Sequence, residues 1–118
     1  MEMLDKQWEE GRDWISQSLE RNPNEPYALL SLAVIEAELG NFSIAITLAA
    51  KGCSISPTDP NLRFMQARVL RLSGKPQQAM EILLALPVEL QFTQVCQDEM
   101  NTIQKEIEKL GDKGNSTE

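Results

Sequence analysis

The stretch "LGNFSIAITLAAKG" occupies residues 39–52, and the stretch "LSGKPQQAMEILLA" occupies residues 72–85. Each begins with a leucine that is followed within two residues by a glycine, Gly40 in the first and Gly74 in the second. Five residues after each glycine comes an alanine, Ala45 and then Ala79. The same pattern therefore returns after 34 residues, which indicates that the chain repeats a structural unit.

Other residues recur at the same spacing, and each residue type has a known role at a helix end or a helix contact. Proline fits the first turn of a helix, where its missing N–H group is not needed. Glycine adopts the left-handed conformation that ends many helices. Alanine lets two helix backbones approach closely, because it places no large side chain between them. The further pairs at this spacing are Pro23 with Pro57, Pro26 with Pro60, and Ala33 with Ala67.

Apolar residues recur at helical spacing between these markers, and no useful length of chain alternates with period two. We therefore expect an all-α fold without a sheet. Each glycine turn is expected to join two antiparallel helices, and that pair is the repeating unit. The predicted helices span residues 4–21, 26–39, 42–54, 60–73, 76–86 and 88–110.

On these residues the chain resembles the tetratricopeptide repeat (TPR) family. The resemblance rests on the 34-residue period, the paired alanines and glycines, and Pro57 at the close of the first full unit. Some positions depart from the family pattern: Leu29 and Glu36 stand where an aromatic residue is usual, and Pro87 comes early. The resemblance implies antiparallel helix-pair repeats that form a right-handed superhelix.

The repeat spacing also divides the chain. We expect one TPR-like helical domain over residues 1–110, which consists of a half repeat at 1–23, repeats at 26–59 and 60–87, and a C-terminal capping helix at 88–110. The capping helix carries an apolar stripe on one side and polar residues on the other, as the end of a helical stack requires. Residues 111–118 contain no apolar residue and are predicted to form a disordered tail.

Composition limits the function and the location of the protein. A net charge of −7 argues against general nucleic-acid binding. There is no uninterrupted apolar run long enough for a membrane span, so we expect no direct membrane insertion. The N-terminal residues do not read as a signal peptide, which favours the cytoplasm; a periplasmic or membrane-tethered context stays open if this is an excised domain. Cys53 and Cys96 are expected to be free thiols.

Nothing in the sequence indicates catalysis. The chain has no histidine, which removes the commonest general base and the commonest metal ligand. It has no CxxC motif and no glycine-rich phosphate loop. We therefore predict that the protein is not an enzyme and uses no cofactor and no metal.

The family resemblance implies a concave groove, lined by the first helix of each pair, that binds a peptide or a helical segment of a partner. Such a groove would combine aromatic and aliphatic anchors with two arginines, which suits an amphipathic partner with acidic residues. Alternatively, Arg68 and Arg71 pair with Glu38, or with Asp98 and Glu99. The residues expected in the groove are Tyr27, Leu30, Val34, Glu38, Asn61, Phe64, Arg68, Arg71 and Leu72.

Two functions from different classes follow. The first is a protein–protein interaction module that acts as an adaptor, a chaperone, a scaffold or an assembly factor. The second is a structural self-assembly unit that forms a homodimer through its open N-terminal end, where Trp8 and Trp14 lie.

Overall fold

The computed structural model describes the backbone of residues 2–116 and the side chains of residues 7–110. Over that part of the chain the protein is all-helical, without any strand, as the sequence predicts. The helices are α1 (Glu2–Arg21), α2 (Pro26–Glu38), α3 (Phe42–Ile55), α4 (Pro60–Leu72), α5 (Pro76–Leu84), α6 (Val88–Gln91) and α7 (Gln94–Ser116). No helix in the described part combines the length and the apolar run needed to cross a membrane.

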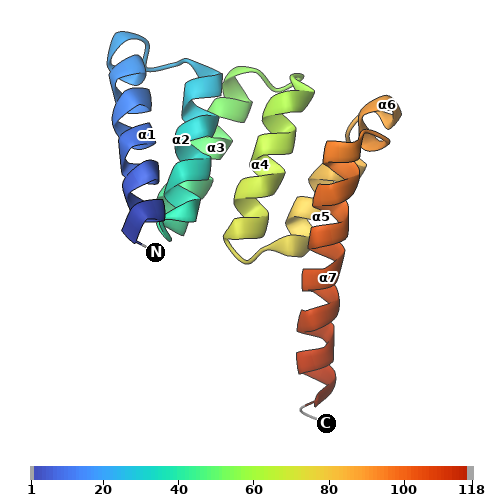
Figure 1. Cartoon of the computed structure of the whole chain (residues 1–118). Coiled ribbons are helices and arrows are strands. Elements are labelled where there is room, and N and C mark those ends of the chain that lie inside the picture. Colours follow the sequence, from blue (N-terminus) through green and yellow to red (C-terminus); the bar gives the residue numbers. More distant parts are fainter. Residues whose placement is uncertain (1, 117–118) are drawn as a thin grey trace.

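The two glycine turns have the conformation that the sequence predicts. Gly40, between α2 and α3, has a φ angle of 89°, and Gly74, between α4 and α5, has a φ angle of 79°. Both angles lie in the left-handed region, which an L side chain disfavours. The chain therefore reverses direction after α2 and again after α4, and it produces two similar helix–turn–helix pairs (Figure 1).

The helices pack in sequence order. In Figure 1, α1, α2 and α4 lie side by side, and α3 and α5 lie behind them. α2 packs against α1, α3 and α4, whereas α7 packs mainly against α5 and touches α4 less. Because α2 has helices on three sides, it buries apolar residues around most of its circumference.

The hydrophobic core consists of two clusters. The first cluster joins α2, α3 and one face of α4, and includes Leu30, Ala45, Cys53 and Leu62. The second joins another face of α4 to α5 and α7, and includes Ala67, Ala79, Leu83, Cys96 and Ile103. The four repeated alanines, Ala33, Ala45, Ala67 and Ala79, have no exposed surface, so their expected burial is confirmed.

The segment predicted as one helix over residues 88–110 is divided between α6 and α7. The division falls at Phe92 and Thr93, where the Thr93 hydroxyl accepts a hydrogen bond from the Cys96 amide at 3.4 Å. A threonine in this position caps a new helix, because its oxygen satisfies an amide that has no partner in the first turn. The apolar pattern continues across the break and therefore conceals it.

α7 also continues beyond residue 110, where the sequence predicts a disordered tail. The backbone of residues 111–116 is helical, and residues 117 and 118 lie outside the described part of the chain. Adding a residue to an existing helix is much easier than starting one, so a packed helix can extend into a polar segment.

Candidate functional site

A cleft between α4 and the α6–α7 region is the most distinct feature of the side on which the sequence predicts a groove. It has a volume of about 300 Å³ and is bordered by Asn61 and Phe64 of α4 and by Leu90, Val95 and Cys96 of the C-terminal region. Asn61, Phe64 and Arg68 lie on successive turns of α4, so they share one face of that helix. The structure therefore brings three of the residues predicted for the groove together.

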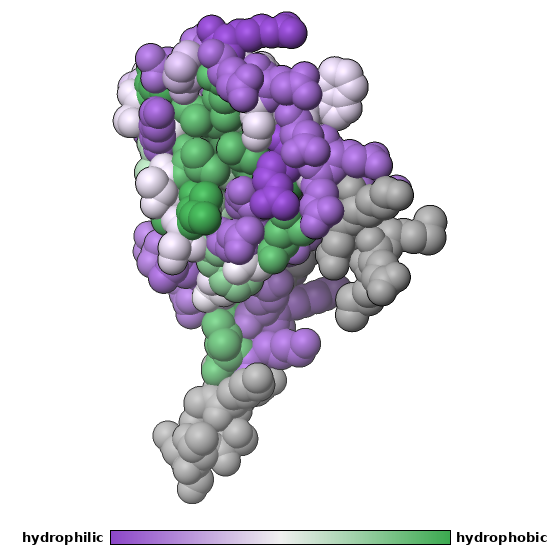
Figure 2. Space-filling model, turned by 90° about the vertical axis from the view of Figure 1, so that its left-hand side faces the viewer, coloured by the Kyte–Doolittle hydropathy of each residue, from purple (hydrophilic) through white to green (hydrophobic). Residues whose placement is uncertain are grey.

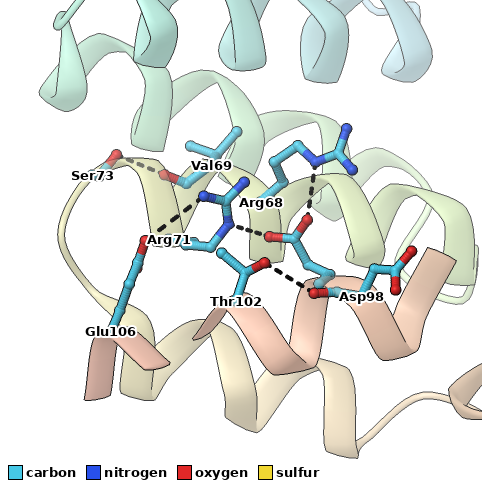
Figure 3. Close-up of polar contacts among 8 residues, drawn as sticks. Arg68, Val69, Arg71, Ser73, Asp98, Thr102 and Glu106 are labelled. Atoms are coloured by element: carbon cyan, nitrogen blue, oxygen red, sulfur yellow. Dashed lines mark hydrogen bonds and ion pairs between the residues drawn. The ribbon is translucent and has the colours of Figure 1, made fainter. Parts of the chain in front are cut away.

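Beside this cleft, two arginines of α4 hold one carboxylate of α7. Arg68 donates from Nε to Oε1 of Glu99 at 3.3 Å, and Arg71 donates from Nε to Oε2 of the same residue (Figure 3). Arg71 also lies 3.8 Å from Glu106, measured from Nη1 to Oε1. The Glu99 side chain is only 5% exposed, so this carboxylate is shielded from water and satisfied by the arginines.

This cluster matches one of the alternatives that the sequence leaves open for the arginines. The pairing is with Glu99, and neither Asp98 nor Glu38 forms an ion pair within the described residues. Arg71 is 18% exposed and contacts two acids, so its main role is to attach α7 to α4.

Arg68 differs from Arg71 because much of it stays accessible. Its side chain is 41% exposed, and its guanidinium carbon lies 5.4 Å from the centre of the Phe64 ring. Only its Nε atom bonds to Glu99, so its two terminal nitrogens keep hydrogen-bonding capacity. The aromatic ring orients this guanidinium at the edge of the cleft.

The remaining residues predicted for the groove differ in how far they are exposed. Leu30 is fully buried in the first core cluster and does not lie on the surface, contrary to the sequence prediction. Val34 and Leu72 are partly buried against the same cluster. Leu30 is buried because α2 packs against three other helices. Tyr27 and Glu38 are exposed near opposite ends of α2.

Tyr27 extends the surface from α2 to the start of α4. Its hydroxyl donates to Oδ2 of Asp59 at 2.5 Å, and Oδ1 of Asp59 accepts from the Asn61 amide at 2.9 Å. The hydrogen bond from Tyr27 is the main reason that the pKa of Asp59 is lowered, and the same bond raises the pKa of Tyr27. Asp59 therefore both caps α4 and positions the Tyr27 ring.

The two cysteines are free, as predicted, and both are buried. Burial raises the pKa of both thiols, which keeps them protonated and poorly nucleophilic near neutral pH. Among the residues that the structure describes, no group of three histidine, cysteine, aspartate or glutamate residues is arranged to hold a metal ion.

The far wall of the cleft was not predicted from the sequence. Leu90 and Val95 come from the segment that was expected to be one continuous helix, in which both belong to the apolar stripe. Val95 is instead 61% exposed, because within α7 it lies about 140° around the helix axis from Met100. The threonine at position 93, three residues before Cys96, is the signal that could have located this break.

Compared with the models of known protein families and with curated proteins, the sequence matches none of them.

Proposed function

We propose that this protein is an interaction module that binds a segment of a partner protein on the surface formed by Tyr27, Asn61, Phe64 and Arg68. The observation that carries the proposal is the exposed Arg68 guanidinium, held over Phe64 at the edge of an apolar cleft. A cation beside an apolar cleft suits an amphipathic segment that carries a carboxylate.

The proposal includes a TPR-like architecture, in which antiparallel pairs stack in a right-handed superhelix and α7 caps the stack. Its support is the agreement between the 34-residue spacing and equivalent local structure. The glycines at this spacing both have positive φ angles, and the alanines at this spacing are all fully buried. In such an architecture α2 and α4 are the first helices of their pairs and line the concave side.

The partner is expected to place an apolar side chain in the cleft and a carboxylate against the free nitrogens of Arg68. Arg71 contributes less than its sequence position suggests, since Glu99 and Glu106 already neutralise it. Glu99 limits the site to one exposed cation, so a single carboxylate near an apolar anchor is the minimal recognition element. The class of function is adaptor, chaperone, scaffold or assembly factor.

The test is a pull-down from the source cells with the wild-type protein and the Arg68→Gln and Phe64→Ala variants. Both variants should lose the same partner. With the purified partner, the wild-type affinity should fall as salt is added, and Arg68→Gln should flatten that dependence. Phe64→Ala should lower the affinity while the salt dependence changes little.

Lys105→Gln is a matched control, because it removes a positive charge from the exposed side of α7. A partner that binds all three variants equally, or that protects the opposite side of α4, would contradict the proposal.

A second candidate function is self-assembly through the N-terminal end. The observation in its favour is that the Trp14 side chain on α1 is 74% exposed. A large exposed aromatic residue often marks a contact surface. Light scattering over a range of concentrations should then show a dimer that Trp14→Ser abolishes, whereas a constant monomer mass would exclude this function.

A further inference from the structure

A small depression lies where the connection between α3 and α4 meets the end of α5. Its volume is about 230 Å³. Its polar lining side chains are Thr58 and Arg63, and we call it the Arg63 depression. Its apolar walls are formed by Pro57, Pro60 and Pro87, together with Ile82, Ala85 and Leu86. Because proline has a fixed φ angle and no N–H group, three of these residues form rigid walls without a backbone donor.

Arg63 brings a positive charge to this depression, and no acid pairs with it. Its Nε and Nη2 atoms donate to the carbonyl oxygen of Pro57 at 3.3 Å and 3.2 Å. That acceptor is neutral, and Arg63 forms no ion pair within the described residues. Arg12, Arg68 and Arg71, in contrast, each pair with a buried glutamate. The Arg63 guanidinium is therefore held in place while its charge remains unpaired.

Arg63 also keeps a hydrogen-bond donor that a ligand can reach. The side chain is half-buried. Its Nη1 atom donates no hydrogen bond within the described residues, and it is open to solvent. Thr58 is an exposed residue of the same depression, and its hydroxyl can act as a second donor. Two donors thus lie among apolar walls.

The acids near the depression do not occupy it. None of its lining residues is an acid. The Asp59 carboxylate accepts hydrogen bonds from the Tyr27 hydroxyl and from the Asn61 amide. Glu81 and Glu89 are exposed, and neither forms an ion pair with Arg63. The depression therefore has a cation and no counter-charge of its own.

The buried thiol of Cys53 is sensitive to the same charge. Burial raises the pKa of this thiol, and Arg63 opposes that rise more strongly than Asp59 adds to it. Of these two charges, the positive one therefore dominates at the end of α3. This balance agrees with the absence of an ion pair at Arg63 in the described part of the chain.

Apolar surface alone would not indicate the chemistry of a ligand. A band of hydrophobic side chains is also visible when the molecule is viewed from its α1 end (Figure 2). The Arg63 depression differs because a guanidinium and a hydroxyl lie among its apolar walls. A guanidinium matches the geometry of a carboxylate, and hydrogen bonds between the two are strengthened by charge.

We propose that the Arg63 depression is a binding site for an aliphatic carboxylate. The hydrocarbon part of the ligand would pack against Ile82, Ala85 and Leu86. Its oxygens would accept hydrogen bonds from Nη1 of Arg63 and from the Thr58 hydroxyl. The ligand is either a small free acid or a glutamate side chain, which share this chemistry.

This site is distinct from the proposed partner surface, although the two are neighbours. Pro60 and Leu86 border both the Arg63 depression and the cleft beside α7. The cation of the cleft is Arg68, and the cation of the depression is Arg63. Arg68→Gln should therefore leave carboxylate binding in the depression unchanged, whatever its effect on a partner protein.

The experiment is a titration of the isotopically labelled protein with isocaproate, followed by the amide and arginine Nε–Hε signals. Saturable shifts are expected at Arg63, Thr58 and Ala85. Isocaproamide has the same hydrocarbon chain but no charge. It should bind at least about tenfold more weakly, because hydrogen bonds to a charged group are stronger.

A second compound distinguishes the two sources of the carboxylate. The N-methylamide of N-acetyl-glutamic acid carries the same group on a peptide unit. Tighter binding of this compound than of isocaproate would assign the site to a glutamate of a partner protein. The reverse order would assign it to a small free acid.

Three variants locate the site. Arg63→Gln removes the charge and should abolish saturable binding of isocaproate. Thr58→Val keeps the shape of an exposed side chain, does not disturb the bond to Pro57, and should weaken binding about tenfold. Ala85→Leu should weaken the binding of both isocaproate and isocaproamide, because it narrows the depression. Arg21→Gln is the matched control, since it removes the same charge from the exposed end of α1.

Four results would overturn the proposal. Equal binding of isocaproate and isocaproamide would show that the depression recognises only an apolar chain. Shifts confined to Arg68 and Phe64 would place the carboxylate in the other cleft. Binding that survives both Arg63→Gln and Thr58→Val would exclude the proposed donors. An absence of saturable shifts in the wild-type protein would exclude the site itself.

Discussion

Ala45 and Ala79 show how little space separates the helices of each pair. Both side chains have no exposed surface, and each belongs to one of the two core clusters. We expect Ala45→Leu and Ala79→Leu each to lower the free energy of unfolding by about 1–3 kcal/mol, because three added carbon atoms have no room. Urea denaturation measures the change. Ala50→Leu, on the exposed side of α3, is the control and should leave the midpoint nearly unchanged.

The hydrogen bond between Tyr27 and Asp59 predicts a specific dependence of stability on pH. A lowered pKa for Asp59 means that the bond contributes stability above about pH 4, the ordinary range of this carboxyl, and that this contribution is lost as the pH falls through the lowered pKa. The raised pKa of Tyr27 means that its contribution is present below about pH 10 and is lost as the pH rises through the raised value.

Tyr27→Phe should therefore destabilise the protein at neutral pH and make the loss of stability in acid less steep. The variant retains the aromatic ring, and Asp59 still accepts from the Asn61 amide, so the cap of α4 stays intact. Thermal denaturation between about pH 2 and pH 8 tests this prediction. Parallel curves for the two proteins would contradict it.

At the scale of elements, Glu99 decides how firmly α7 is attached to α4. Replacing it with alanine leaves Arg68 and Arg71 without their shared acceptor, and hydrogen bonds to charged groups contribute about 1.5–3 kcal/mol. We expect Glu99→Ala to lower the free energy of unfolding by an amount in that range and to speed hydrogen exchange of the α7 amides. Asp98→Ala changes a neighbouring acid on the exposed side of the same helix. It should have little effect, and an equal effect of the two substitutions would contradict the role of Glu99.

The helices, the glycine turns and the buried alanines could be predicted because each depends on local chemistry or on spacing. The division between α6 and α7 could not, since the apolar residues continue across it and only the Thr93 cap marks the break. The burial of Leu30 depends on packing with the rest of the chain. The added Cβ of an alanine at Gly52 would lie 2.1 Å from Cδ2 of Leu30. The close contact between α2 and α3 therefore also depends on Gly52, which the 34-residue pattern does not single out.

The candidate site could be predicted only in part, because some of it depends on local spacing and the rest on how distant helices pack. Asn61, Phe64 and Arg68 follow helical spacing within α4, so sequence alone places them on one face. The choice of Glu99 as the acid that pairs with the arginines depends on where α7 crosses α4.

At the scale of the whole molecule, the two core clusters each contain one cysteine, so thiol labelling can follow them separately. Cys53 is 3% exposed in the first cluster and Cys96 is 2% exposed in the second. The second cluster depends on α7, whose main contact is with α5 alone. We therefore expect Cys96 to react with a thiol reagent faster than Cys53 in moderate urea. Cys53→Ala and Cys96→Ala isolate each signal, and faster labelling of Cys53 would contradict the expectation.

The division of the core also has a consequence for synthesis of the chain on the ribosome. All fully buried members of the first cluster lie between Leu30 and Val69. They therefore leave the ribosome before α5, α6 and α7 do, and the N-terminal part can condense while later residues are still being made. The face of α4 that carries Ala67 and Leu70 of the second cluster stays exposed until then. α5 and α7 cover this face once they have been made.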